Sequence, residues 1–236
     1  MTDARLTLVT GASRGIGRAA ALALAARGDT VIALARSKKA LETLDDEIRA
    51  QGGQAVLVPL DLTDAKGIDA LGGVLHERFG RLDGLVANAG VLGTLGPLQT
   101  VRPRSFEETI EVNLTANWRL IRSLDPLLRV GRDPRAVFVS SGVVPRPRAF
   151  WGPYQASKAG LESLVAAWAD ETEQSPIRVN VFDPGAVATE MRAEAMPGED
   201  PATLPSPDEV GAALAALTAA AETRHGDRIT FRERNP

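Results

Sequence analysis

Short runs of apolar and β-branched residues alternate along the chain with longer segments whose apolar residues recur at helical spacing. Several short runs are almost continuously apolar, as in Val56-Leu57-Val58 and Val137-Phe138-Val139, which is typical of strands buried on both faces of a sheet. The pattern predicts strands at Leu6–Val9, Thr30–Ala35, Gln54–Pro59, Leu85–Ala87, Ala136–Ser140, Arg178–Phe182 and Asp227–Phe231.

Helical patterns fill the intervals between these strands. They predict helices at Gly15–Arg27, Lys38–Gln51, Ala65–Phe79, Ser105–Leu128, Tyr154–Thr172 and Pro207–Ala220. Regular alternation of strands and helices favours a parallel sheet with helices on both faces. We therefore predict a single α/β domain over residues 1–236. Its expected architecture is a Rossmann-type, doubly wound parallel sheet of about seven strands, with ligands bound at the carboxyl ends of the strands.

One segment interrupts the alternation. Residues 192–207, just before the last predicted helix, are rich in proline, glycine and acidic residues. A linker would also have this composition, but loops of this length inside compact domains are more often functional. We therefore expect a substrate lid at residues 190–207.

Composition narrows the class of protein. A net charge of −3 and the absence of cysteine argue against nucleic-acid binding, disulfides and thiolate chemistry. The first strand begins close to the N-terminus, and the apolar run Ala19–Ala26 is shorter than the roughly 20 residues of a membrane helix. Neither histidine has ligand partners at metal-binding spacing. The chain is thus expected to be a cytoplasmic protein that binds no metal, no membrane and no nucleic acid.

A glycine-rich segment, Thr10–Gly17, follows the first strand and opens the first helix. Gly11 permits a tight turn, Gly15 permits a pyrophosphate to approach the backbone, and Gly17 permits close packing of helix on strand. Phosphates would lie at the helix N-terminus, where free N–H groups favour negative charge. An ordinary turn is the alternative, although the position between strand and helix favours a dinucleotide site.

The end of the second strand bears on the choice of cofactor. An acidic residue about 20 positions after the glycines would bind the ribose hydroxyl and select NAD. Here Arg36 and Ser37 stand at this point, and Arg14 lies within the glycine segment. A guanidinium makes charge-assisted contacts with a 2′-phosphate, so we expect NADP(H) to be preferred over NAD(H). Solvated surface cations are the alternative.

Tyr154, the only tyrosine, and Lys158 are four residues apart, so their side chains share one face of a predicted helix. A tyrosine with its ordinary pKa of about 10 is a poor base at neutral pH. We expect the ammonium of Lys158, together with an oxidised nicotinamide, to stabilise the phenolate and lower that pKa by about 3 units. Tyr154 would then exchange a proton with an alcohol or carbonyl oxygen while hydride moves to or from the cofactor.

Over nearly its whole length the chain resembles the short-chain dehydrogenases/reductases. Motifs similar to theirs occur in order: Thr10–Gly17, Asp61-Leu62, Asn88-Ala89-Gly90, Val112-Asn113-Leu114, Tyr154 with Lys158, and Pro184–Thr189. Phe150–Pro153 and Met191–Pro197 look similar to a little-characterised bacterial oxidoreductase subgroup of this family. Each motif alone has a bland interpretation as a cap, turn or strand end, but those interpretations do not explain the order.

The resemblance implies roles for particular residues. Asn113, Ser141, Tyr154 and Lys158 match the catalytic set, in which Ser141 polarises the substrate and Asn113 orders a water through Lys158. Asp61 matches an adenine contact, Asn88 a sheet-stabilising position, and Thr189 a nicotinamide contact. The expected cofactor-binding residues are Gly11, Ser13, Arg14, Gly15, Ile16, Gly17, Arg36, Ser37, Asp61, Leu62, Asn88, Ala89, Gly90, Tyr154, Lys158, Pro184, Gly185, Val187 and Thr189.

The expected substrate is a small apolar ketone, aldehyde or secondary alcohol, bound by Ser141, Trp151, Tyr154 and Met191. Arginines at 146, 148 and 192 leave open an acidic group on that substrate. Apolar positions in the two long helices (Leu120, Leu124, Leu164, Val165 and Trp168) suggest a homodimer or homotetramer, unless they are buried against the sheet. The resemblance implies an NADP(H)-dependent oxidoreductase acting on CH–OH groups. A catalytically idle dinucleotide-binding sensor or scaffold on the same fold is the alternative.

Overall fold

A parallel seven-stranded sheet with the strand order β3-β2-β1-β4-β5-β6-β7 forms the centre of the computed structural model, which describes residues 4–231. The strands are β1 Leu6–Thr10, β2 Thr30–Ala35, β3 Gln54–Pro59, β4 Gly84–Ala87, β5 Arg135–Val139, β6 Arg178–Asp183 and β7 Arg228–Thr230. The order reverses direction between β1 and β4, and the ends of these two strands open the crevice in which doubly wound folds bind ligands. The predicted fold class and all seven predicted strands are confirmed.

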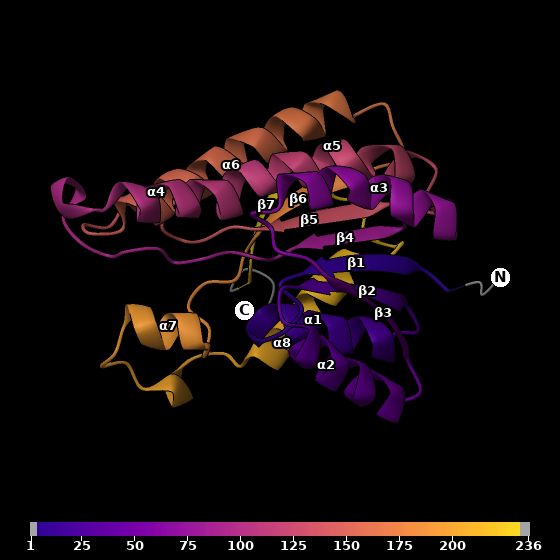
Figure 1. Ribbon diagram of the computed structural model, residues 1–236, viewed down its shortest axis with the longest axis horizontal. Coiled ribbons are helices and arrows are strands. Elements are labelled where there is room, and N and C mark those ends of the chain that lie inside the picture. Colours follow the sequence, from indigo (N-terminus) through magenta and orange to yellow (C-terminus); the bar gives the residue numbers. More distant parts are fainter. Residues whose placement is uncertain (1–3, 232–236) are drawn as a thin grey trace.

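Helices cover both faces of the sheet (Figure 1). They are α1 Gly15–Ala26, α2 Lys38–Ala50, α3 Ala65–Phe79, α4 Pro103–Ile110, α5 Ala116–Arg129, α6 Gly152–Glu171, α7 Glu190–Ala195 and α8 Pro207–Leu217. One buried apolar cluster joins α3, α5 and α6 to the sheet, and a second joins α1, α2 and α8 to the opposite face. Strands buried on both faces need apolar side chains in every position, which explains the continuous apolar runs.

The long helix predicted at Ser105–Leu128 is interrupted in the structure. A wider, π-helical turn at Glu111–Thr115 separates α4 from α5. The amide side chain of Asn113 lies inside this turn, bonded on both sides to the backbone of Val91. Extra residues of this kind in a helix redirect a side chain and occur frequently at functional sites. A periodicity argument could not detect the interruption, because the apolar spacing continues through it.

Two further differences concern the lid and the helices expected to pair. Residues 192–207 were expected to be loop-like, but the helix α7 extends into them as far as Ala195, and a short turn, η3, lies at Pro201–Thr203. Leu120, Leu124, Val165 and Trp168 are at most 4% exposed within the single chain. These four residues pack in the cluster that covers the sheet, as the alternative interpretation holds, whereas Leu164 is only partly buried against that cluster.

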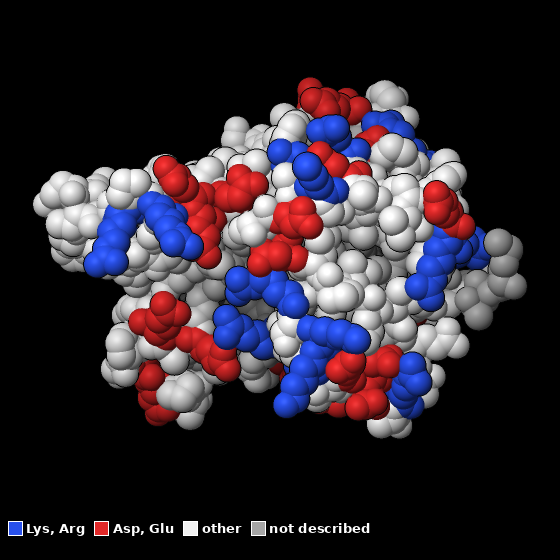
Figure 2. All heavy atoms as spheres, in the orientation of Figure 1, with Lys and Arg blue, Asp and Glu red and all other residues white. Residues whose placement is uncertain are grey.

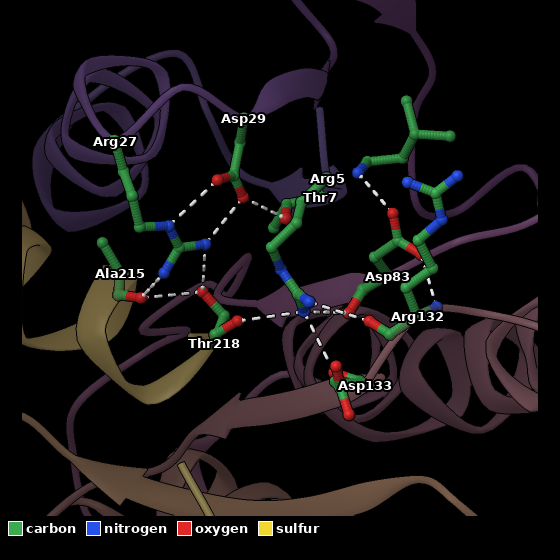
Figure 3. Close-up of polar contacts among 10 residues, drawn as sticks. Arg5, Thr7, Arg27, Asp29, Asp83, Arg132, Asp133, Ala215 and Thr218 are labelled. Atoms are coloured by element: carbon green, nitrogen blue, oxygen red, sulfur yellow. Dashed lines mark hydrogen bonds and ion pairs between the residues drawn. The ribbon is translucent and has the colours of Figure 1, made fainter. Parts of the chain in front are cut away.

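At the amino ends of the strands, a network of ionic and polar side chains ties the sheet to its connections (Figure 3). Asp29 accepts hydrogen bonds from Thr7 and, through both carboxylate oxygens, from Arg27. Arg27 also donates to the carbonyl of Ala215 and to the hydroxyl of Thr218, at the end of α8. These contacts therefore tie the residues before β2 to the end of α8.

Candidate active site and cofactor cleft

A cleft of about 440 Å³ lies at the carboxyl ends of the strands. It runs from the glycine segment, past the ends of β4 and β5, to α7. Every residue that sequence reasoning assigned to the site lines this cleft except Gly17, Ser37 and Asn113. Residues distant in sequence meet there because parallel strands bring their carboxyl ends to one edge of the sheet.

The glycine segment has the geometry of an anion-binding loop. Gly15 begins α1 with a φ of +54°, a conformation that favours glycine. No side chain caps the N-terminus of this helix, so its first amide groups are available to a bound anion. Gly17 does not line the cleft, but a Cβ there would lie 2.3 Å from the carbonyl oxygen of Gly11. Because Gly17 has no Cβ, the glycine segment can pack directly against α1.

Asn88 holds the floor of the cleft together. Its side-chain nitrogen donates to the carbonyl of Thr10 at 3.1 Å, and its backbone N–H donates to the Thr10 hydroxyl at 3.1 Å. The amide of Ala89 donates to the same hydroxyl at 3.0 Å. The strand ends of β1 and β4 are thereby joined at the point where the sheet order reverses, as expected for a sheet-stabilising motif.

Two arginines at the mouth of the cleft have acidic neighbours. Arg14 pairs with Glu190 at 2.5 Å, with both side chains about three-quarters exposed, and the nearest nitrogen of Arg36 lies 3.9 Å from Asp61. Exposed pairs of this kind contribute little, on the order of 0–1 kcal/mol, so an anion can replace the carboxylates. Figure 2 shows basic side chains at the centre of this face, beside a hollow in the surface. Ser37, by contrast, caps α2 by accepting from the amide of Ala40.

The predicted catalytic residues converge at the ends of β5 and α6. Tyr154 and Lys158 lie in the first two turns of α6, both less than 10% exposed. The Lys158 ammonium donates to the carbonyl of Val139 at 2.7 Å and lies 5.9 Å from the centre of the tyrosine ring. Ser141 follows β5 and lines the same cleft beside Tyr154, whose pKa it lowers. A hydroxyl, a phenol and an ammonium therefore share one small region of the cleft.

Asn113 lies just behind this group. Its side-chain nitrogen donates to the carbonyl of Val91 and to the hydroxyl of Ser157, both at 2.9 Å, and its oxygen accepts from the Val91 amide at 2.8 Å. A Cβ on Gly90 would lie 3.1 Å from the Asn113 oxygen and 3.5 Å from the Lys158 ammonium. Gly90 thus lies between the asparagine and the lysine, and the amide of Asn113 joins the loop after β4 to Ser157 of α6.

Burial controls the protonation of the two titratable groups. It raises the pKa of Tyr154 to about 12, with Asp183 adding to the rise and the Ser141 hydrogen bond opposing it. Burial also lowers the pKa of Lys158 to about 8, against a raising effect of Glu162. The sequence predicted a lowered pKa for Tyr154, and that prediction counted the positive charge of an oxidised nicotinamide. Within the protein alone, burial and Asp183 raise the pKa instead. Tyr154 is therefore a protonated phenol at neutral pH.

The end of the cleft beyond Tyr154 is apolar. Leu92, Val143 and Tyr154 form a small buried cluster, against which Leu95, Trp151, Met191 and Ala195 pack. The rings of Trp151 and Tyr154 meet edge to face at 5.9 Å. Arg192 also lines the cleft, and its guanidinium is bound through two nitrogens to Glu199 of its own segment, at 2.5 and 2.6 Å.

Sequence reasoning missed several residues of this wall. Leu92 and Val143 come from two separate loops and Ala195 from the end of α7, and no spacing rule connects them. Glu190, the partner of Arg14, was also missed, although it directly follows the predicted contact residue Thr189. Thr189 itself caps α7 by accepting from the amide of Arg192 at 3.2 Å. Only the folded chain brings these positions together.

No helix in the described part of the chain combines the length and the hydropathy that crossing a membrane requires. The same residues, 4–231, hold no group of three or more histidine, aspartate or glutamate side chains placed to bind a metal ion.

Comparisons with known proteins agree with this arrangement. The family described as short chain dehydrogenase matches residues 5–200. The uncharacterized oxidoreductase YciK of Escherichia coli K12 is 38% identical over 209 residues, 87% of this chain and 82% of that protein. A short chain dehydrogenase of Shigella flexneri 2a complexed with NADP superposes with a TM-score of 0.91 at 35% identity, covering 98% of both chains.

A second solved structure, a short chain dehydrogenase of Escherichia coli CFT073 complexed with NADPH, has a TM-score of 0.90 at 36% identity and covers 98% of this chain and 97% of its own. The similarity to YciK confirms the predicted relationship to a little-characterised bacterial subgroup. With the strand order, the cleft and the matched motifs in agreement, the chain belongs to the short-chain dehydrogenase family and is a nicotinamide-dependent oxidoreductase acting on CH–OH groups.

Proposed function

We propose that the protein is an NADP(H)-dependent reductase of an apolar carbonyl compound, with Tyr154 as the general acid and base. The observation that carries this proposal is the buried Tyr154, placed between the hydroxyl of Ser141 and an apolar pocket, in the cleft that begins at the glycine segment. NADPH, when bound, supplies hydride to the carbonyl carbon.

The protein groups then have separate tasks. Ser141 and Tyr154 both donate hydrogen bonds to the carbonyl oxygen, which orients the substrate and withdraws charge from its carbon. Tyr154 transfers its proton as the alkoxide develops, and its high pKa keeps that proton available at neutral pH. The ammonium of Lys158, fixed by Val139, stabilises the phenolate that remains. Asn113 keeps the loop beside Lys158 in place, and we propose that it orders the proton-relay water of the family.

Preference for NADP(H) is proposed from Arg14 and Arg36. Their acidic neighbours are held only by exposed ion pairs, and a 2′-phosphate offers a stronger, charge-assisted partner than either carboxylate. The two relatives solved with NADP and NADPH support the same choice. Asp61 and Leu62 would contact the adenine. Pro184, Gly185, Val187 and Thr189 would hold the nicotinamide end.

The experiment is turnover of a panel of ketones and aldehydes, followed by NADPH absorbance, with NADH in parallel. The proposal expects at least one apolar ketone or aldehyde to be reduced, faster with NADPH. An idle cofactor-binding module would bind NADPH, measured by fluorescence, and reduce no member of the panel. Acidic carbonyl compounds serve as the control for substrate charge. They are expected to be poor substrates, since Arg192 is occupied by Glu199.

We propose that residues 190–207 act as a lid. Met191 and Ala195 of α7 pack on the pocket wall, while the pair Arg14–Glu190 joins this segment to the glycine segment. Breaking this single exposed ion pair costs little, so the segment can open, and it excludes water when it closes. Hydrogen exchange of residues 190–207 should slow when NADPH and a substrate analogue are added together; unchanged exchange in the ternary complex would show that it is no lid.

We also propose a cytoplasmic homodimer or homotetramer. The support is the outer face of α5, where Trp118 is 43% exposed beside Arg119 and Arg122. Tryptophan and arginine are enriched at interfaces between protein chains. Light scattering at micromolar concentration should give a multiple of the 24.9 kDa chain mass, and Trp118→Glu should reduce it; a monomeric mass of the unmodified protein contradicts the proposal.

A further inference from the structure

Arg228, at the start of β7, occupies a position where an apolar side chain is expected. In the parallel register it pairs with Val181 of β6, and paired residues of neighbouring strands point to the same face. Val181 belongs to the apolar cluster beneath α6. An arginine on this face, with its side chain only 30% exposed, is costly to bury unless it is fully paired.

The guanidinium of Arg228 is paired in three directions. Its Nε donates to the two carboxylate oxygens of Glu162 on α6, at 3.1 and 3.3 Å. One Nη donates to a carboxylate oxygen of Asp183 at 2.9 Å and to the backbone carbonyl of Ser141 at 3.2 Å. A single side chain therefore joins α6, the end of β6 and the end of β5.

Each of these partners leads to a group of the proposed reaction. Glu162 lies one helical turn after Lys158, and its carboxylate accepts from the hydroxyl of Ser140 at 2.5 Å. The second oxygen of Asp183 accepts from the amide of Gly185 at 2.9 Å, which fixes the turn proposed to hold the nicotinamide. Ser141, proposed to bind the substrate carbonyl, is held through its own backbone.

The charges around Tyr154 depend on the same cation. Asp183 on β6 and Glu162 on α6 both lie near the site, where Asp183 raises the pKa of Tyr154 and Glu162 raises that of Lys158. Arg228 is the cation paired with both carboxylates. Without it, two partly buried negative charges would be left with Lys158 as their nearby cation, and the phenolate of Tyr154 would be harder to form.

We propose that Arg228 is a positioning residue for the reaction. It holds Ser141 and the turn at Gly185 in place relative to Tyr154, and it neutralises Glu162 and Asp183 behind them. The proposal rests on the reductase function proposed above. It predicts that Arg228 controls the rate of the chemical step and the acidity of Tyr154, without itself touching substrate or cofactor.

Three variants test the proposal. Arg228→Met removes the charge and keeps most of the side-chain volume, and Arg228→Lys keeps the charge but loses the forked hydrogen bonding. Arg27→Met is the matched control. Arg27 forms a similar set of contacts, to Asp29 and to the end of α8, but at the amino ends of the strands (Figure 3). All three are measured on folded protein, for kcat, substrate KM and NADPH affinity.

Arg228→Met should lower kcat on the order of 10–100-fold, as expected when a reacting group is displaced by a fraction of an ångström to an ångström, while NADPH affinity stays within about threefold. Because Tyr154 is the only tyrosine, 3-fluorotyrosine labelling yields one fluorine resonance whose titration midpoint reports the phenol. That midpoint should move to higher pH in Arg228→Met and stay at the wild-type value in Arg27→Met.

A wild-type kcat or an unmoved midpoint in Arg228→Met overturns the inference. If Arg228→Met does not fold, Arg228→Lys decides the question: kcat should fall while the midpoint remains near that of the unmodified protein, and an unchanged kcat counts against the proposal. The fluorine titration needs no substrate. It therefore still tests Arg228 if the unmodified protein reduces no carbonyl compound, an outcome that would end the reductase proposal alone.

Discussion

Arginine–aspartate pairs stand at both ends of the sheet, and they have different surroundings. At the amino ends of the strands, Asp83 is completely buried, and its carboxylate accepts from the amides of Leu6 and Arg132 and from the side chain of Arg81. At the carboxyl ends, Arg228 and Asp183 form a similar pair, but next to it Tyr154, Ser141 and Lys158 line an open cleft.

The two ends differ in how many polar groups remain available to bind a ligand. At the amino ends of the strands, the contacts run between side chains and the backbone of neighbouring connections (Figure 3), which stabilises the fold. At the open end, ionic pairs hold the backbone from behind and free a phenol, a hydroxyl and a helix N-terminus to face the cleft. Charged pairs of the same kind therefore stabilise the fold at the amino ends of the strands and position the reactive groups at the carboxyl ends.

The largest expected effect separates the two ends by activity. Tyr154→Phe should reduce turnover by about 10²–10⁴-fold, the usual contribution of a general acid. NADPH affinity and the melting temperature should stay nearly unchanged. Steady-state kinetics with a substrate identified by the panel, together with NADPH titration, make the measurement. Substantial turnover in this variant would mean that another group donates the proton and that the site has been misassigned.

Arg27→Met should produce the opposite result. Asp29 is only 4% exposed. Without Arg27 its carboxylate loses its paired cation and keeps only the hydrogen bond from the Thr7 hydroxyl. Loss of one partner of a buried pair typically costs about 3–5 kcal/mol of unfolding free energy. Urea unfolding measures that loss, and kcat per folded molecule should be unchanged. A fall in kcat without a loss of stability would break the division between the two ends.

Lys158→Met should sharpen the comparison by making the open end more stable and inactive. The folded-state pKa of Lys158 is about 8, below its ordinary value of 10.5, so at pH 7 the folded protein bears the full cost of burying the ammonium. We expect the variant to be about 1–3 kcal/mol more stable at pH 7, after the lost hydrogen bond to Val139 is counted.

The gain should vanish with pH in a defined window. As the pH rises from 8 to 10.5, folded wild-type protein releases the Lys158 proton while the unfolded chain keeps it, and wild-type stability therefore increases. Unfolding measured at pH 7 and pH 9.5 should show the two proteins converging. A variant less stable than wild type at pH 7 would show that the lysine supports the fold and contradict this interpretation.

The smallest expected effect concerns the exposed rim of the cleft. Arg36→Asp should abolish or invert a preference for NADPH over NADH of at least tenfold, which corresponds to about 1.4 kcal/mol, because repulsion replaces attraction at the 2′-phosphate. Lys38→Asp is the control: it makes the same charge change next to the cleft, at a residue paired with Glu42. An equal loss in both variants would indicate a general field and no contact by Arg36.

The sequence alone determined the fold class, the strand positions and most of the cleft. Buried parallel strands require continuous apolar runs, and glycine or proline turns at their ends mark where a site forms, so Thr10–Gly17 and Pro184–Thr189 could be located without coordinates. Tyr154 and Lys158 could be paired because helical spacing is local. Apart from the helix interrupted at Glu111–Thr115 and the unexpected helix α7, only the ends of elements moved, by a few residues, since terminal turns depend on tertiary contacts.

Tertiary structure alone decided what surrounds those residues. It made Tyr154 a weak acid with a pKa of about 12, because burial of its side chain depends on loops from the whole chain. It placed Asn113 in a π-helical turn, buried four of the five apolar residues that had suggested an oligomer, and assigned Ser37 to a helix cap. It also brought Arg228, 74 positions from Tyr154 in the numbering of the chain, behind the catalytic group. Periodicity describes a residue's neighbours along one element, whereas burial, charge pairing and packing across elements arise only when the sheet has assembled.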